Sequence, residues 1–121
     1  MFSWKRPGPA EWLVVGLGNR SVTPDAIGPR CADHVLVTRH LTHRDPEQFG
    51  SFFPVAALAA GVLGTTGVES GELVRAVSDR IRPGFILAVD ALAARSVRRL
   101  CTTVQIADTG ITPGSGVGNA R

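Results

Sequence analysis

The sequence predicts an α/β fold, a three-layer sandwich whose central sheet is mostly parallel. Two short runs, residues 12–17 and 85–89, are apolar throughout, which is typical of strands that a parallel sheet buries on both faces. Between them, apolar residues recur at helical spacing over residues 70–81. Strands that alternate with helices in this way favour an α/β sandwich.

The N-terminal half is expected to supply two strands and one helix. A helix is predicted from about residue 27 to residue 41. Pro29 is compatible with this helix because proline is tolerated in a first turn. Its packed side would carry Ala32, Val35, Leu36 and Arg39. The other expected elements are a flexible arm at 1–10, a strand at 12–17, a loop at 18–24, an exposed connection at 42–49 and a second strand at 54–60.

The C-terminal half is expected to add one long helix and two strands. Ser70 offers an N-cap to the helix, and Pro83 and Gly84 end it. The other expected elements are a glycine-rich loop at 61–67, strands at 85–89 and 102–106, a short helix at 91–100, a turn at 108–110 and a flexible tail at 112–119. Since no helix closes the sheet after the last strand, we expect the chain to be truncated at its C-terminus.

Composition limits the class of protein. With 121 residues, 44% of them apolar, the chain is long enough for one domain with a core, which we place at residues 11–121. The net charge is +3, and the basic residues are scattered except for Arg95, Arg98 and Arg99, so no nucleic-acid module is implied. No apolar stretch approaches the ~20 residues that a membrane span needs.

The two cysteines indicate a reducing compartment. Cys31 and Cys101 lie singly, on segments predicted as a helix and a strand, without a Cys-x-x-Cys spacing or a secretory leader. We therefore expect buried free thiols in a cytoplasmic protein rather than a disulfide.

Two aspartates follow the two apolar strands and are the candidate catalytic residues. Asp25 comes shortly after the first strand, and Asp90 comes directly after residues 85–89. Ligands of open α/β sheets gather outside the carboxyl ends of the strands, where two convergent carboxylates can share a proton and activate water. Asp90 is expected to be the more buried member, because an apolar strand leads straight into it. The alternative for either residue is a structural helix cap or Asx-turn.

Other chemical motifs are incomplete. Ser21 occupies the position of the third glycine of a dinucleotide fingerprint, and the glycines at 61–67 lack the Lys-Ser/Thr ending of a phosphate loop. Ser115 lies in no nucleophile elbow, and neither cysteine has a histidine partner in a catalytic context. We expect neither a nucleotide cofactor nor a serine or cysteine nucleophile.

The three histidines do not predict a metal site. His40 and His43 are three residues apart, but no His-Glu-x-x-His or similar pattern surrounds them or His34. Solvated or helix-terminal side chains are the better interpretation, so we expect neither a metal ion nor another cofactor.

Six segments in order resemble the core of the spore germination protease family. They are VVGLGN at 14–19, VTPDAIGP at 22–29, VTRHL at 37–41, GVLGTTGVE at 61–69, VDALAAR at 89–95, and IADTG at 106–110 with PGSGVGN at 113–119. The family consists of cytoplasmic endopeptidases, made as zymogens, that degrade small acid-soluble spore proteins at germination.

The resemblance implies a phosphorylase/hydrolase-like fold and an aspartic-type mechanism whose catalytic carboxylates are Asp25 and Asp90. It also implies a homo-oligomer, a tetramer, in the spore core, with a propeptide upstream and a further strand-helix portion downstream. Hydrogenase-maturation endopeptidases are similar to this family and place an acidic metal ligand at the position of Asp25. Arg95, five residues after Asp90, is a candidate to bind a substrate carboxylate, and a salt bridge within the domain is the alternative.

Two other functions stay open. VGLGN at 15–19 and TRH at 38–40 resemble the opening of peptidyl-tRNA hydrolase, although Asn-Arg-Ser stands where that family has Asn-Pro-Gly. A non-catalytic scaffold that binds acidic spore proteins is the third possibility.

Overall fold

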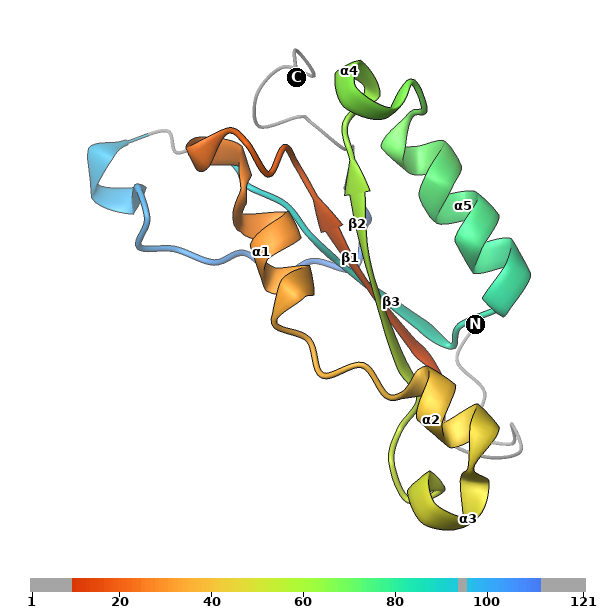
Figure 1. Cartoon of the computed structure of the whole chain (residues 1–121). Helices are drawn as coiled ribbons and strands as arrows, with labels where there is room; N and C mark the ends of the chain where they lie inside the picture. Colours follow the sequence, from red (N-terminus) through yellow and green to blue (C-terminus); the bar gives the residue numbers. More distant parts are fainter. Residues whose placement is uncertain (1–9, 94–95, 112–121) are drawn as a thin grey trace.

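The computed structural model describes residues 10–93 and 96–111. Within these residues the central sheet has three parallel strands. Strands β1 (Trp12–Leu17), β2 (Val55–Gly61) and β3 (Phe85–Val89) lie in the order β2-β1-β3 (Figure 1). Val14 pairs with Ala57 on one side and with Leu87 on the other. The predicted parallel sheet and three of its predicted strands are therefore confirmed.

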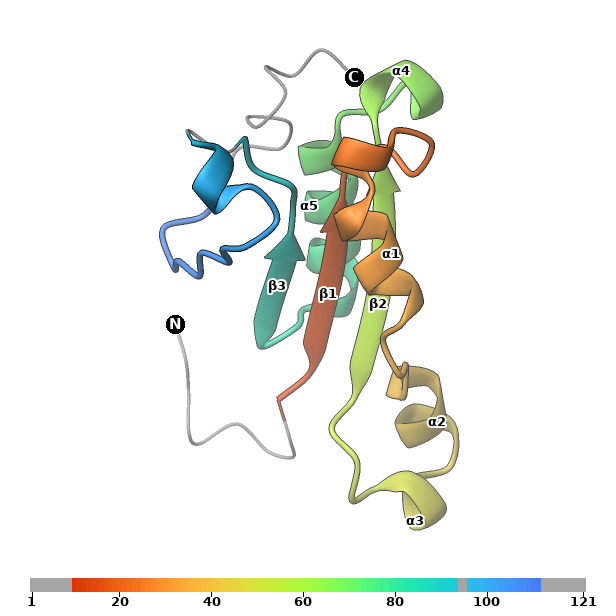
Figure 2. The same ribbon diagram turned by 90° about the vertical axis from the view of Figure 1, so that its left-hand side faces the viewer.

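Helices cover the two faces of the sheet. Helix α1 (Ile27–Asp33) lies on one face and helix α5 (Ser70–Ile81) lies on the other (Figures 1 and 2). Every second residue of β1 points toward α5, and the core on this side contains Leu13, Val15, Leu17 and Ala60 with the α5 side chains Leu73, Val74, Val77 and Ile81. The structure thus has the three layers that the sequence predicts.

On the other face, α1 packs directly against the backbone of β1. A Cβ atom on Gly16 would lie 2.1 Å from the carbonyl oxygen of Gly28, and one on Gly28 would lie 2.0 Å from that of Leu17 and 2.6 Å from that of Val89. Only glycine allows this approach. The contact places the start of α1 at the carboxyl ends of β1 and β3.

The long helix predicted over residues 27–41 is wrong. Helix α1 ends at Asp33, and a separate helix α2 (Arg39–Arg44) begins after a turn and an irregular segment. Of the residues predicted to share a packed side, Ala32 is buried and Val35 and Arg39 are half-buried, but Leu36 is 77% exposed.

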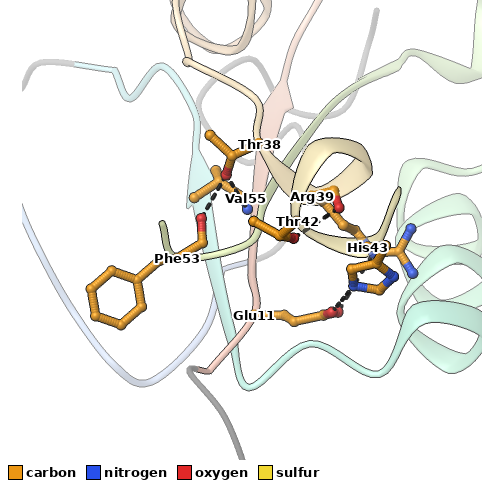
Figure 3. A network of polar contacts seen from close by, with 7 residues as sticks. All are labelled: Glu11, Thr38, Arg39, Thr42, His43, Phe53 and Val55. Atoms are coloured by element: carbon orange, nitrogen blue, oxygen red, sulfur yellow. Dashed lines mark hydrogen bonds and ion pairs between the residues drawn. The ribbon is translucent and has the colours of Figure 1, made fainter. Parts of the chain in front are cut away.

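Thr38 explains the break. Its backbone N–H donates to the carbonyl oxygen of Val55 at 2.9 Å, and its hydroxyl donates to that of Phe53 at 2.6 Å. The same hydroxyl accepts the N–H of Val55 at 3.0 Å (Figure 3). The buried Thr38 is therefore bound to the chain that enters β2, which an uninterrupted helix would prevent.

The short helices α2 and α3 lie at the amino edge of the sheet. Glu11, the residue before β1, contacts His43 and lies 3.5 Å from Nε of Arg39, both on α2 (Figure 3). The connection predicted at residues 42–49 includes α3 (Pro46–Phe49), whose N-cap Asp45 accepts the N–H of Gln48.

The segment between β2 and α5 also differs from expectation. A single turn, α4 (Leu63–Thr66), lies in the predicted glycine-rich loop. Glu69, not Ser70, is the N-cap of α5, because Glu69 and Glu72 form a reciprocal capping box. The Ser70 hydroxyl instead donates to the carbonyl oxygen of Gly61 at 2.9 Å.

After β3 the described chain has little regular structure. Only the 3₁₀ turn η2 (Val97–Arg99) lies in the predicted helix at 91–100, whose residues 94–95 are outside the described part. The fourth strand predicted at 102–106 is wrong: Val104 is 89% exposed and Ile106 is 92% exposed, and no strand of the described chain pairs with this segment. Alternation without a partner does not make a strand. The predicted tail at 112–119 and residues 1–9 of the predicted arm lie outside the described residues.

No helix within residues 10–93 and 96–111 is both long enough and apolar enough to cross a bilayer.

Candidate active site

Asp25 is a buried carboxylate at the carboxyl edge of the sheet. It is the last residue of the 3₁₀ turn η1 (Thr23–Asp25), which follows β1 after a short loop, and it is 1% exposed. The backbone N–H of Asn19 donates to its Oδ2 at 2.8 Å. The loop between β1 and α1 therefore folds over Asp25 and binds its side chain.

Gly18 makes this fold of the loop possible. Its φ is +122°, which side-chain-bearing residues rarely adopt, and a Cβ here would lie 2.1 Å from the carbonyl oxygen of Asp25. The same Cβ would lie 3.2 Å from Oδ1 of the Asp25 side chain. The glycine thus allows the end of β1 to touch the aspartate that follows it.

Asp90 lies at the same edge. It follows β3 directly, is half-buried, and its Oδ1 accepts the N–H of Ala91 at 2.9 Å. Because β3 is the parallel neighbour of β1, with Val89 paired to Gly16, both predicted aspartates follow adjacent strands. The chain leaves β1 and β3 at the same end of the sheet (Figure 2). Their joint action in catalysis stays a prediction.

The expected order of burial is wrong. Asp25, not Asp90, is the more buried carboxylate. Residues of its own loop, Gly18 and Asn19, lie against Asp25, whereas β3 is an edge strand of the described sheet, with Ile86 and Leu87 each 47% exposed. An apolar strand that lies at the edge of the described sheet therefore does not bury the residue that follows it.

An ion pair that the sequence analysis missed lies beside this loop. The guanidinium of Arg20 binds the carboxylate of Asp33 through both nitrogens, Nη1 to Oδ2 and Nη2 to Oδ1, the second at 3.1 Å. These hydrogen bonds lower the pKa of Asp33 and raise that of Arg20. No local pattern indicates a pair thirteen residues apart. By contrast, a Gly-Asn pair after a strand signals the Asx-turn in which the Asn19 side chain accepts the N–H of Ser21.

The histidines singled out in the sequence lie on α2 or directly after α1. Arg95, the candidate for substrate binding, lies outside the described residues. His34, His40 and His43 are exposed, as expected of solvated side chains. Among residues 10–93 and 96–111, no three His, Cys, Asp or Glu side chains are grouped so that they could hold a metal ion.

The cysteines are free but not buried. Both Cys31 and Cys101 are exposed, so the expectation of buried thiols is wrong. Cys31 lies on the outer side of the short helix α1, and Cys101 lies in the irregular segment after β3, where no core forms around it in the described chain. Cys31 also lines a shallow open groove of about 300 Å³ along α1, with Thr23, Ala26, Ile27, Arg30 and His34.

The position of α2 argues against peptidyl-tRNA hydrolase chemistry. His40, the histidine of that resemblance, lies on α2, whose residues Arg39 and His43 contact Glu11 at the amino edge of the sheet. The two aspartates lie at the carboxyl edge. The histidine and the loop after β1 therefore do not form one site.

Comparison with known proteins agrees with the family resemblance. The family model for germination protease matches residues 7–121. Curated germination proteases are similar at 54% identity over 110 residues in Geobacillus sp. (90% of this chain, 30% of that protein), 53% over 116 in Priestia megaterium (95% and 31%) and 53% over 113 in Bacillus subtilis (93% and 31%). The chain thus spans about a third of the length of these relatives.

Proposed function

Because the chain belongs to the germination protease family, we propose that it is the catalytic core of an endopeptidase that hydrolyses small acid-soluble spore proteins at germination. The observation that carries the proposal is the placement of Asp25 and Asp90 after two adjacent parallel strands, at the edge where α/β enzymes bind substrates. The cytoplasmic location in the spore core, the zymogen form and the tetramer belong to the same proposal.

The mechanism that we propose uses the two carboxylates in opposite protonation states. One, ionised, removes a proton from the attacking water, while the other, protonated, donates to the carbonyl oxygen of the scissile peptide bond. Asp90 is the partly exposed member, so we assign the water to it. Asp25 then donates its proton to the carbonyl oxygen, and the N–H of Asn19 orients its side chain.

This assignment requires access to Asp25. At 1% exposure, the Asp25 side chain does not meet substrate while the loop from Gly18 to Asp25 stays closed. The loop therefore has to open to admit a carbonyl oxygen and to close again before the chemical step, which re-forms the hydrogen bond from the N–H of Asn19 to the Asp25 side chain.

The test is cleavage of a small acid-soluble spore protein by the protein in its native form. Asp25→Asn and Asp90→Asn preserve side-chain shape and remove the carboxylate, so each should abolish most of the cleavage. The matched control is Asp79→Asn, which changes an exposed residue of α5. This variant should cleave the spore protein at the wild-type rate. If the wild-type protein binds the spore protein without cleaving it, the scaffold function replaces the peptidase; cleavage unaffected by either active-site change would refute the aspartic mechanism.

Arg95 enters this proposal as a substrate-binding residue. A peptide with glutamate before the scissile bond should be cleaved faster than its glutamine counterpart, because a guanidinium forms strong bidentate pairs with carboxylates. Arg95→Ala should remove that preference. Equal rates for the two peptides would exclude Arg95 from recognising substrate charge.

A further inference from the structure

The loop over Asp25 is anchored to α1 by one side chain. Arg20 reaches from the loop to Asp33, the last residue of α1, and binds it with two parallel hydrogen bonds. Two-pronged contacts of this kind fix orientation as well as distance. Both partners are charged at neutral pH, and the hydrogen bonds from Arg20 lower the pKa of Asp33 further.

The residue that touches Asp25 is the direct neighbour of this anchor. Asn19 donates its N–H to Asp25 at 2.8 Å, accepts the N–H of Ser21 on its side chain at 2.9 Å, and accepts the N–H of Val22 on its carbonyl oxygen at 3.1 Å. The contact to Asp25 thus depends on a short loop of local turns. Such loops open locally at low free-energy cost unless a further contact restrains them.

We propose that Arg20 and Asp33 are positioning residues that hold the loop closed, so that the N–H of Asn19 keeps the Asp25 carboxylate in one orientation. The catalytic consequence rests on the proposed function, whereas the effect on the loop does not. The pair is exposed, with side chains 53% and 48% accessible, so it adds little to global stability. Its effect is therefore expected in the loop and in turnover rather than in the melting temperature.

The experiment measures two quantities in Arg20→Gln. By NMR, amide hydrogen exchange of Asn19 should become at least about fivefold faster, because the loop opens more often. In peptide cleavage, kcat should fall about three- to tenfold with little change in KM, because Asp25 acts in the chemical step rather than in binding. The melting temperature should stay within about 2 °C of the wild type.

Two variants separate this role from a general loss of charge. Arg80→Gln removes an exposed arginine of α5 that forms no ion pair within the described chain. It should change neither the amide exchange of Asn19 nor kcat. The charge swap Arg20→Asp with Asp33→Arg should restore Asn19 exchange to within about twofold of the wild type, because it rebuilds the pair.

The outcomes distinguish this inference from the proposed function. Asn19 exchange unchanged in Arg20→Gln, or a charge swap that restores nothing, overturns the positioning role even if the protein is an active peptidase. If the wild-type protein cleaves no spore protein, the proposed function fails, and faster Asn19 exchange in Arg20→Gln still supports the role of the pair in the loop.

Discussion

Gly16 and Gly28 bring strand β1 and helix α1 into backbone contact, since a Cβ on Gly16 would lie 2.1 Å from the carbonyl oxygen of Gly28. This contact sets the position of the turn that carries Asp25, because α1 begins two residues after it. The site thus depends on two residues that have no side chain.

Gly16→Ala and Gly28→Ala should each destabilise the fold by about 1–3 kcal/mol or more, because the added methyl group meets backbone that cannot move aside. Urea unfolding measures the loss. Gly71→Ala, in α5 with open space around its Cβ position, is the control and should stabilise the protein by about 0.5–1 kcal/mol. Equal stabilities of Gly16→Ala and the wild type would contradict the close packing.

Gly18→Ala should reduce peptide cleavage about 100-fold or more, because its Cβ would displace both the backbone and the side chain of Asp25. Gly67→Ala is the matched control: its φ of +73° is also left-handed, but nothing lies within 4 Å of its Cβ position. It should cost about 1–2 kcal/mol of stability from backbone strain and leave the cleavage rate unchanged. Similar rates for the two variants would show that Gly18 does not position Asp25.

Thr38→Val should destabilise the protein by about 1–3 kcal/mol, because it leaves the N–H of Val55 and the carbonyl oxygen of Phe53 without the hydroxyl that they bind. Thr38→Ser keeps the hydroxyl and should lose less. Thr42→Val removes a single hydroxyl contact, to the carbonyl oxygen of Arg39, and serves as the control in the same denaturant titration. A fully stable Thr38→Val would mean that the hydroxyl of Thr38 does not hold α2 to β2.

The pH dependence of the Arg20–Asp33 pair follows from the lowered pKa of Asp33. A carboxyl whose pKa is lower in the folded state contributes stability that is complete above its unfolded pKa and is lost as the pH falls through its folded pKa. In Arg20→Gln the pKa of Asp33, followed by NMR, should rise toward 3.8, and high salt should weaken the shift in the wild type. An Asp33 titration that is unchanged in Arg20→Gln would rule out the pair in solution.

The strands and the helix α5 were predictable because their patterns are local. The apolar runs of β1 and β3 and the spacing of Leu73, Val74, Val77 and Ile81 each require only a few consecutive residues. The two elements that were predicted wrongly, the helix at 27–41 and the strand at 102–106, depend on residues that are distant in sequence. Thr38 ends the predicted long helix through Val55, and the alternating segment that contains Val104 finds no strand to pair with in the described chain.

The candidate site was predictable in position but not in detail. The rule that α/β sites follow the strands places Asp25 and Asp90 at one edge. The burial of Asp25 results from a loop that the left-handed Gly18 turns back over it, and the pairing of Arg20 with Asp33 depends on where α1 ends. Neither the burial of Asp25 nor the Arg20–Asp33 pair follows from a local sequence pattern, because both depend on the folded structure.

The central claim is that Asp25 and Asp90 act together on one water and one peptide bond, and a double-mutant cycle tests it most directly. Spore-protein cleavage should fall at least about 100-fold in Asp25→Asn and in Asp90→Asn, and the double variant should be no more than about threefold slower than the slower single variant, because groups that act as a unit are not additive. Retention of cleavage within about tenfold of the wild type in either single variant, or losses that multiply in the double variant, would contradict the claim.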